Sequence, residues 1–180
     1  PSGTYDGSGM SIAICDSGID TAHPRLGGGG SPIFNDKVIG GYDTGDDDAD
    51  PRPNSATGHP HGTACAGIAA GDLGDAGDYI GGVAPGAKLY AIKISQGTGG
   101  SASDSSMIAG WEWAITHQHD DPANPILIIS TSFGGDNFAT PCDAAVPAMT
   151  TAAANAVAAG ITLFASSGND GYCSSMGWPA

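Results

Sequence analysis

The stretch Ser11-Ile-Ala-Ile-Cys-Asp16 is a short apolar run that ends in an aspartate and is followed at once by Ser-Gly, where the chain can turn. Runs of this kind predict β-strands, and further runs cover residues 88–94, 126–129 and 161–165. Another strand is expected to begin at Val38. The runs at 126 and 161 carry apolar residues on both alternating faces, which indicates strands that are covered on both sides.

Helical patterns lie between these runs. One helix is expected to begin at Ser103 or Asp104, a second to run from about Asp143 to Ala159, and a short third from near Gly62 to Gly71. The apolar residues expected on the buried faces of the first two are Met107, Ile108, Trp111, Ala114 and Ile115, and Val146, Met149, Ala153 and Val157. Strands that alternate with helices predict a three-layer α/β/α fold around a mostly parallel sheet with right-handed crossovers.

The composition limits the possible functions. The 180 residues suit one domain or most of one, and the formal net charge is −14, from five Lys and Arg against 19 acidic residues. With no basic cluster, the chain is not expected to bind nucleic acid or an anionic membrane, and no apolar run approaches the ~18 residues of a membrane span. All acidic residues except Glu112 are aspartates, which favours turns and calcium sites over the alternative, a generic acidic surface.

Polar clusters follow several predicted strands, at the sheet edge where parallel sheets bind ligands. Asp16 ends a strand, and its carboxylate can orient an imidazole, coordinate a metal, accept a phosphoryl group or only satisfy a turn. His61 precedes Gly-Thr and a small-residue helix. A zinc site with His59 and Cys65 is the weaker alternative there, because zinc needs at least three converging ligands. Asn169 follows Ser-Ser-Gly at another strand end, where its amide can donate to an oxyanion or only form a tight turn.

Taken together, these clusters resemble the motifs of the subtilisin-like serine proteases, the subtilases. Their order and spacing agree over nearly the whole chain, and several motifs in register are far more specific than one. The motifs are Ile12-Ala-Ile-Cys-Asp16-Ser-Gly-Ile-Asp20, His61-Gly-Thr-Ala-Cys-Ala-Gly67, Gly82-Val-Ala-Pro85, Gly110-Trp-Glu-Trp-Ala114, Ser132-Phe-Gly-Gly135 and Ala165-Ser-Ser-Gly-Asn169.

By this resemblance Asp16 would orient His61, His61 would be the general base and acid for a serine nucleophile, and Asn169 would donate to the tetrahedral oxyanion. An extended substrate would lie between two backbone edges that glycines leave uncovered. Asp104 stands where the family often has a bulky wall residue, which implies greater tolerance of polar or basic side chains at a distal subsite. The residues implied to bind substrate are Gly100, Ser101, Ala102, Asp104, Ser132, Phe133, Gly134, Ala165, Ser166, Ser167 and Gly168.

The family's nucleophile lies in a Gly-Thr-Ser-Met-Ala-type motif, which these 180 residues do not contain. The resemblance therefore implies that residues 1–180 are part of a peptidase domain, incomplete at both ends, and inactive without a C-terminal portion that carries the serine. The first alternative is an inactive fragment or a non-catalytic component of a protease complex. The second is a phosphoryl-transfer or metal-dependent enzyme that uses Asp16 and Asp20, although the chain lacks a glycine-rich phosphate loop and a positioned lysine.

An acidic stretch precedes the histidine motif, with aspartates at 43, 46, 48 and 50. Crowded oxygen ligands in a short loop suit Ca²⁺, and the stretch resembles the calcium loop of thermitase-like subtilases. The implied ligands are Asp43, Asp46, Asp48 and Asp50. Arg52 departs from that pattern, and a solvated acidic turn is the alternative. The family's strong calcium site is not expected here, because Arg25 stands where the family has an aspartate ligand. Asp72, Asp75 and Asp78 lie in a longer loop nearby.

The four cysteines fall into two kinds. Cys142 and Cys173 lie in loops that flank one predicted helix–strand unit, and we predict that they form a disulfide, which would stabilise by roughly 3–4 kcal/mol. Cys15 in a strand and Cys65 beneath His61, as in proteinase K-like subtilases, are expected to be free thiols. Together with the other motifs, the resemblance to the subtilases implies a secreted, calcium-stabilised serine endopeptidase that acts on extended polypeptides.

Overall fold

The computed structural model describes the chain except for residues 1–4, 29–32, 55–59, 75–76, 78 and 99. Parallel strands form the main sheet in the order β2-β3-β1-β4-β6. These strands are β1 (Ser11–Asp16), β2 (Val38–Asp43), β3 (Lys88–Lys93), β4 (Ile126–Thr131) and β6 (Thr162–Ala165). A second, antiparallel pair consists of β5 (Gly135–Phe138) and β7 (Met176–Trp178). The helices are α1 (His61–Ala70), α2 (Asp104–Thr116) and α3 (Pro147–Ala158).

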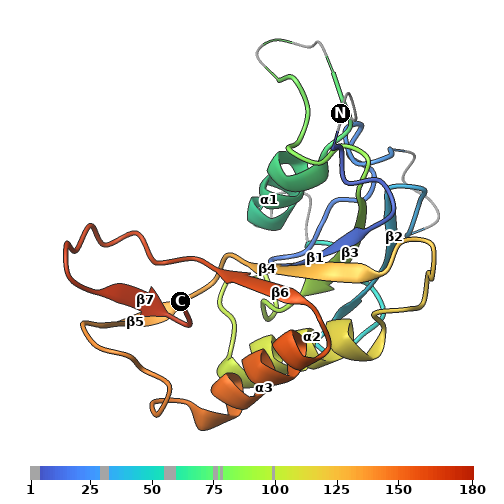
Figure 1. Cartoon of the computed structure of the whole chain (residues 1–180). Helices are drawn as coiled ribbons and strands as arrows, with labels where there is room; N and C mark the ends of the chain where they lie inside the picture. The colour runs from blue at the N-terminus through green and yellow to red at the C-terminus, as the bar shows by residue number, and fades with distance from the viewer. Residues whose placement is uncertain (1–4, 29–32, 55–59, 75–76, 78, 99) are drawn as a thin grey trace.

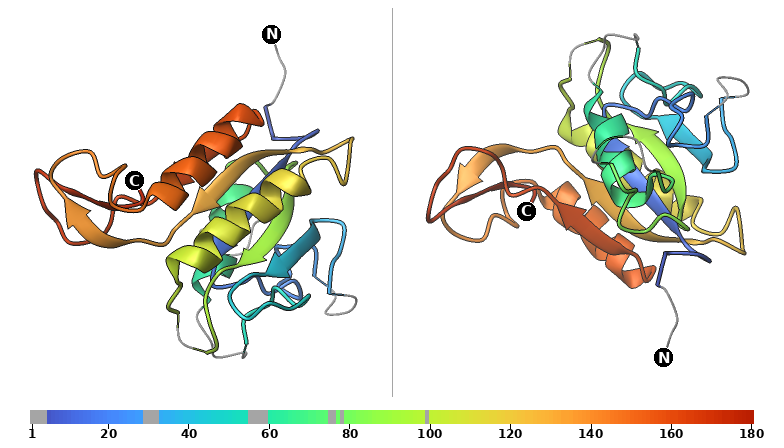
Figure 2. Two further views of the ribbon diagram at one scale, coloured as in Figure 1. Left: turned by 90° about the horizontal axis from the view of Figure 1, so that it is seen from below. Right: turned by 90° about the horizontal axis from the view of Figure 1, so that it is seen from above.

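The helices cover opposite faces of the sheet (Figure 1). Helix α1 lies on one face, and α2 and α3 lie side by side on the other, as Figure 2 shows from below. Each face has its own apolar core: Ile14, Leu89 and Ala66 belong to the core under α1, while Ile92 and Trp111 belong to the core under α2 and α3. The predicted three-layer α/β/α fold is confirmed.

Helix α2 forms as its sequence predicts. Ser103 is the N-cap, and its hydroxyl accepts a hydrogen bond from the Ser106 N–H while the Ser106 hydroxyl accepts one from the Ser103 N–H, a capping box. The predicted apolar face packs inward, with Trp111 almost completely buried. The Trp111 indole N–H donates to the Thr131 hydroxyl at 2.8 Å, which ties the helix to the end of β4.

Helix α3 differs from the prediction in its start and in its buried face. It begins at Pro147, not at Asp143, because proline is favoured in the first turn while residues 143–145 form a turn closed by the Ala145 N–H and the Cys142 carbonyl. Of the predicted face, Met149 is buried and Val146 and Ala153 pack against the core, whereas Val157 is 66% exposed. Ala152 and Ala156 are buried as well. The helix therefore packs against α2 and β6 through Met149 and its buried alanines.

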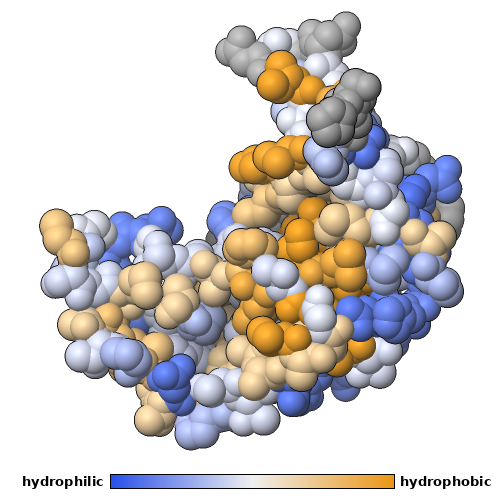
Figure 3. All heavy atoms as spheres, in the orientation of Figure 1, coloured by the Kyte–Doolittle hydropathy of each residue, from blue (hydrophilic) through white to orange (hydrophobic). Residues whose placement is uncertain are grey.

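The prediction that β4 and β6 are covered on both faces is wrong. Leu127 on β4 is 39% exposed and Phe164 on β6 is 55% exposed. The reason is that α1 packs on β1 and β3 and, within the described residues, does not reach the last two strands. Ile68 on α1 is also exposed, at 69%. Figure 3 shows apolar surface gathered below α1, beside a hollow in the outline of the molecule.

All four cysteines are thiols in the structure, so the predicted disulfide between Cys142 and Cys173 is not formed there. The two side chains nevertheless line one cavity of about 610 Å³, together with Met149 from α3 and Met176 from β7. Cys173 is exposed and Cys142 is half-buried. Among the described residues, no helix has the length and apolar character that crossing a bilayer requires.

Candidate active site

The end of β1 holds a buried carboxylate against the first residue of α1. The His61 Nδ1 atom lies 2.8 Å from Asp16 Oδ1 and 3.0 Å from Oδ2. The Ser17 N–H also donates to Oδ1, at 2.7 Å. Gly62 makes the close approach of helix and strand possible, since a Cβ atom there would overlap the Gly18 carbonyl oxygen.

This pair is arranged for proton transfer. The Asp16 side chain is 1% exposed and that of His61 is 55% exposed, so the carboxylate lies behind an imidazole that opens to solvent. A carboxylate at Nδ1 fixes the tautomer with the proton on that nitrogen, which leaves Nε2 as the acceptor. Such an imidazole can take a proton from a nucleophile and return it later.

The imidazole borders a cleft of about 560 Å³. Asn169, which follows β6, borders the same cleft, so the structure brings the three predicted catalytic side chains to one edge of the sheet. Predicted substrate residues line it as well. The lining comprises Ser17, His61, Gly100, Ser132, Phe133, Gly134, Gly135, Asp136, Asn137, Ser166, Gly168, Asn169 and Asp170.

A second cleft of about 470 Å³ adjoins the first and is lined by Gly100, Ser101, Ala102 and Asp104. Phe133 and Gly134 line both clefts. Two antiparallel contacts hold the segment 100–102 that lines the second cleft. A bridge pairs Ser95 with Ala102, and the Gln96 N–H donates to the Ser101 carbonyl at 2.8 Å. The two predicted substrate edges therefore face a shared space.

Not every predicted substrate residue reaches these clefts. Ala165 and Ser167 line neither of them, and the Ser167 carbonyl instead accepts a hydrogen bond from the Gly177 N–H at 2.7 Å. Gly99 lies outside the described residues, as does His59 of the zinc alternative.

Cys65 lies one turn after His61, and its sulfur is 3.8 Å from Nδ1. Asp16, His61 and Cys65 form a group whose possible ligand atoms lie within 4.8 Å of one another. The sequence predicted that Cys65 lies beneath His61, but not that Asp16 joins them in such a group. Because Nδ1 already faces a carboxylate, it cannot also bind a metal without breaking that contact. Burial raises the pKa of the Cys65 thiol, with a smaller opposing effect from Ser132. The deeper Cys15 has a pKa raised by burial to about 12.

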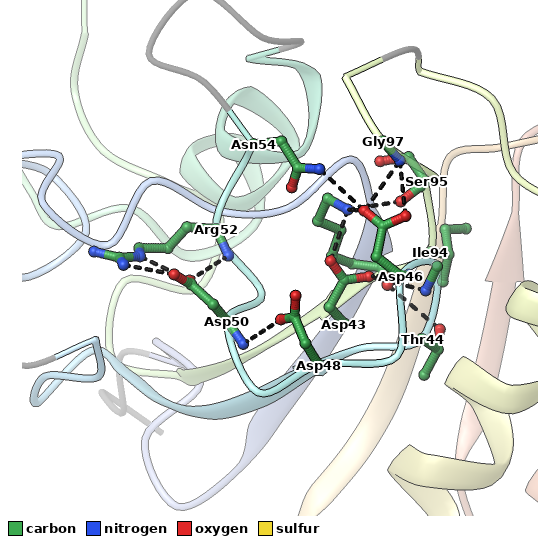
Figure 4. Close-up of polar contacts among 12 residues, drawn as sticks. Asp43, Thr44, Asp46, Asp48, Asp50, Arg52, Asn54, Ile94, Ser95 and Gly97 are labelled. Atoms are coloured by element: carbon green, nitrogen blue, oxygen red, sulfur yellow. Dashed lines mark hydrogen bonds and ion pairs between the residues drawn. The ribbon is translucent and has the colours of Figure 1, made fainter.

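The acidic stretch before α1 does not form a calcium cage (Figure 4). Asp43 and Asp46 contact the Lys93 ammonium at 2.7 and 2.9 Å, and Asp50 pairs with Arg52 through two hydrogen bonds. Within the described part of the chain, the four carboxylates do not converge on one point, whereas Ca²⁺ takes about six to eight oxygens. The side chains as they lie therefore do not fit the ion, and the calcium site stays a prediction. Sequence reasoning missed Lys93.

The second acidic loop is also engaged in ways the sequence did not predict. Asp72 forms an ion pair with Lys37, in which Oδ1 lies 3.1 Å from Nζ. The Arg25 guanidinium donates to the Leu73 carbonyl at 3.1 Å. Asp75 and Asp78 lie outside the described residues. Arg25 thus closes the loop from the position where the family's strong site would have an aspartate.

Fold and site together define an α/β domain with a carboxylate–imidazole pair at the carboxyl ends of its strands. The model of the subtilase family matches residues 7–180, and the chain belongs to that family. Subtilisin E of Bacillus subtilis is 35% identical over 179 residues, which are 98% of this chain and 39% of that protein. The major intracellular serine protease of Bacillus subtilis is 33% identical over 92% of this chain and 44% of its own length.

Among solved structures, Sphericase superposes with a TM-score of 0.75 and 28% sequence identity. The match covers 99% of this chain and 52% of that one. The chain therefore spans about half or less of the relatives that it resembles, while the fold agrees over its full extent.

Proposed function

We propose that this chain supplies the aspartate, the histidine and the oxyanion asparagine of a serine endopeptidase. The observation that carries the proposal is the hydrogen-bonded pair of Asp16 and His61, which opens on a cleft that Asn169 borders. Asp16 orients the imidazole, His61 takes the proton of a serine hydroxyl and returns it to the leaving amine, and Asn169 donates to the tetrahedral oxyanion.

The proposed substrate is an extended polypeptide. Segments 100–102 and 132–134 border the adjoining clefts from different parts of the chain, so a peptide strand can lie between them and form main-chain hydrogen bonds with both. Ser166 and Gly168 line the cleft beside Asn169, where they would contact the residue before the scissile bond.

The proposed partner is a C-terminal portion of the same domain that carries the serine. The exposed apolar side chains of Ile68, Leu127 and Phe164 support this, since monomeric proteins rarely leave a broad apolar face uncovered. A layer packed there would complete the face of the sheet that α1 covers only in part. It would also approach the sheet edge at which His61 lies.

We further propose that the protein acts outside the cell, where Cys142 and Cys173 can oxidise to a disulfide. One matched relative is named as intracellular, so family membership alone does not decide the compartment. Thiol counting under denaturing, non-reducing conditions tests the pairing. Two thiols in the native material agree with it, and four would contradict it.

Labelling of the native protease material with a fluorophosphonate tests the proposed function. The expected signal lies on a serine in the C-terminal portion, with none on residues 1–180, and His61→Ala should abolish it because the serine then lacks its base. His117→Ala is the matched control, since His117 lies at the end of α2 against Trp113 and away from the cleft. Material that contains both portions and takes no label would favour the alternative, an inactive component.

A further inference from the structure

A buried lysine contacts two carboxylates of the acidic stretch. Lys93 is the last residue of β3, and its side chain is 1% exposed. The ammonium donates to Asp43 Oδ2 at 2.7 Å, to Asp46 Oδ2 at 2.9 Å and to the Ser95 carbonyl at 2.8 Å. An ammonium has three N–H donors, so each of them has an acceptor.

The two carboxylates are satisfied from their other sides as well. Asp43 Oδ1 accepts the N–H groups of Gly45 and Asp46, both at 2.9 Å. Asp46 Oδ1 accepts the Gly97 N–H at 2.9 Å, and Asp46 Oδ2 also accepts the Asn54 amide at 3.0 Å. This closed set of contacts joins β2, the acidic stretch and the segment that continues to Gly100.

The electrostatics agree with the geometry. The hydrogen bond from Gly97, followed by those from Lys93 and Asn54, lowers the pKa of Asp46 to about 2. Burial by itself would lower the pKa of Lys93, but the hydrogen bonds to Asp43 and Asp46 outweigh it and raise the pKa above its ordinary value. Asp46 and Lys93 are therefore charged near neutral pH, and the ammonium lies in contact with both the Asp46 and the Asp43 carboxyl groups.

We propose that the Lys93 ammonium is the structural cation of the acidic stretch, residues 43–54, and takes the place that a bound metal ion would occupy between Asp43 and Asp46. An ion that bridges the two carboxylates would need the space that Nζ fills. The stretch is then folded without calcium, and its order depends on one side chain from the neighbouring strand.

Thermal unfolding of the complete peptidase domain that contains residues 1–180 tests this proposal through stability, so its outcome is independent of peptidase activity. Lys93→Met keeps the apolar stem and removes the charge. The midpoint of unfolding should fall by about 10 °C in EDTA, because the buried Asp43 carboxylate and the partly exposed Asp46 carboxylate lose their shared partner. Millimolar calcium chloride should restore part of the loss, since the vacated carboxylates can then share the metal.

Lys88→Met is the matched control. Lys88 begins the same strand, but its ammonium donates to the Asp36 carbonyl at an exposed position, so its midpoint should change by less than about 2 °C. A fall as large as that of Lys93→Met would contradict a special role for Lys93. A Lys93→Met variant as stable as the unchanged chain would contradict it as well.

A second comparison needs no lysine variant and therefore holds even if Lys93→Met fails to fold. Asp48 is a predicted calcium ligand that does not contact Lys93; its carboxylate accepts the Asp50 N–H at 2.7 Å. The unchanged chain and Asp48→Asn are each melted in EDTA and in calcium. The proposal expects calcium to shift the midpoint of unfolding equally in both proteins, whether or not that shift is zero. An equal shift means that any calcium bound lies outside the acidic stretch. A calcium response that Asp48→Asn removes overturns it.

Discussion

Two buried carboxylates at the same edge of the sheet have opposite surroundings. Asp16 ends β1 and Asp43 ends β2, and Lys93 at the end of β3 is the register partner of both. The Asp43 carboxylate contacts the buried Lys93 ammonium, whereas the Asp16 carboxylate contacts the half-exposed imidazole of His61.

The difference shows that the partner decides what a strand-end carboxylate does. An ammonium with an ordinary pKa of about 10.4 keeps its proton near neutral pH and gives a fixed ion pair, whereas an imidazole with an ordinary pKa of about 6.5 can exchange its proton. Lys93 turns toward Asp43 because Asp46 and the Ser95 carbonyl complete its contacts on that side. The first arrangement is structural and the second is chemical.

Of the substitutions that test this comparison, Asp16→Asn should have the largest effect, and it should act on catalysis. The amide no longer selects the productive tautomer of His61, so kcat in the complete peptidase domain should fall about 10⁴-fold while the fold is retained. Turnover of a chromogenic peptide, measured beside urea unfolding, checks both statements. Unchanged turnover would remove Asp16 from the proposed mechanism.

Replacement of Asp43 by Asn should instead act on stability. The buried Lys93 ammonium would then keep Asp46 as its one carboxylate partner. The free energy of unfolding should therefore fall by about 3 kcal/mol. Urea unfolding measures this loss. Asp47→Asn in the same stretch is the control, because Asp47 is exposed and should change stability by less than about 0.5 kcal/mol. Equal losses in the two variants would mean that burial of the ion pair is unimportant.

Replacement of Asn169 by Ala extends the comparison to the end of β6. For a subtilisin, the known loss on removing the oxyanion asparagine is about 100- to 1000-fold in kcat, and we expect the same range here with little change in stability. Asn137→Ala is the control, since Asn137 lines the same cleft but donates to Asp170 at 2.7 Å. A similar loss in both variants would indicate a general disturbance of the cleft.

The smallest expected effect concerns Asp104, the first residue of α2. Its position in the second cleft beside Phe133 and Phe138 predicts tolerance of a basic side chain at a distal subsite. Asp104→Leu should shift the ratio of kcat/KM for peptides with Phe and Lys there by about tenfold or less toward Phe. Glu112→Gln on the same helix, outside both clefts, should leave that ratio unchanged.

The sequence predicted what depends on local patterns. Short apolar runs located the strands of the main sheet, and polar clusters at the strand ends indicated an active site there, whereas the pairing of Asp16 with His61 was implied by the resemblance to the subtilases. The buried Lys93 was missed because its acceptors Asp43 and Asp46 lie 50 and 47 positions away, and a lysine at the end of a strand usually extends into solvent.

Other features were not predictable for different physical reasons. Helix α3 contains alanines on most of its faces, so the pattern could not show which side packs inward. The pairing of β5 with β7 joins short segments with polar residues, where periodicity is weak. The open face of β4 and β6 was missed because apolar composition shows that a strand can be buried, and not what covers it.

The position of strand β6 at the edge of the main sheet affects how the chain can associate with other copies. It is the last strand of the main sheet, and on its outer side no strand is paired with it within the described residues. The four residues Thr162–Ala165 carry no charge and no proline, the features by which proteins usually guard such an edge. We therefore expect concentrated solutions of the isolated chain to form fibrillar aggregates that grow by strand addition at β6.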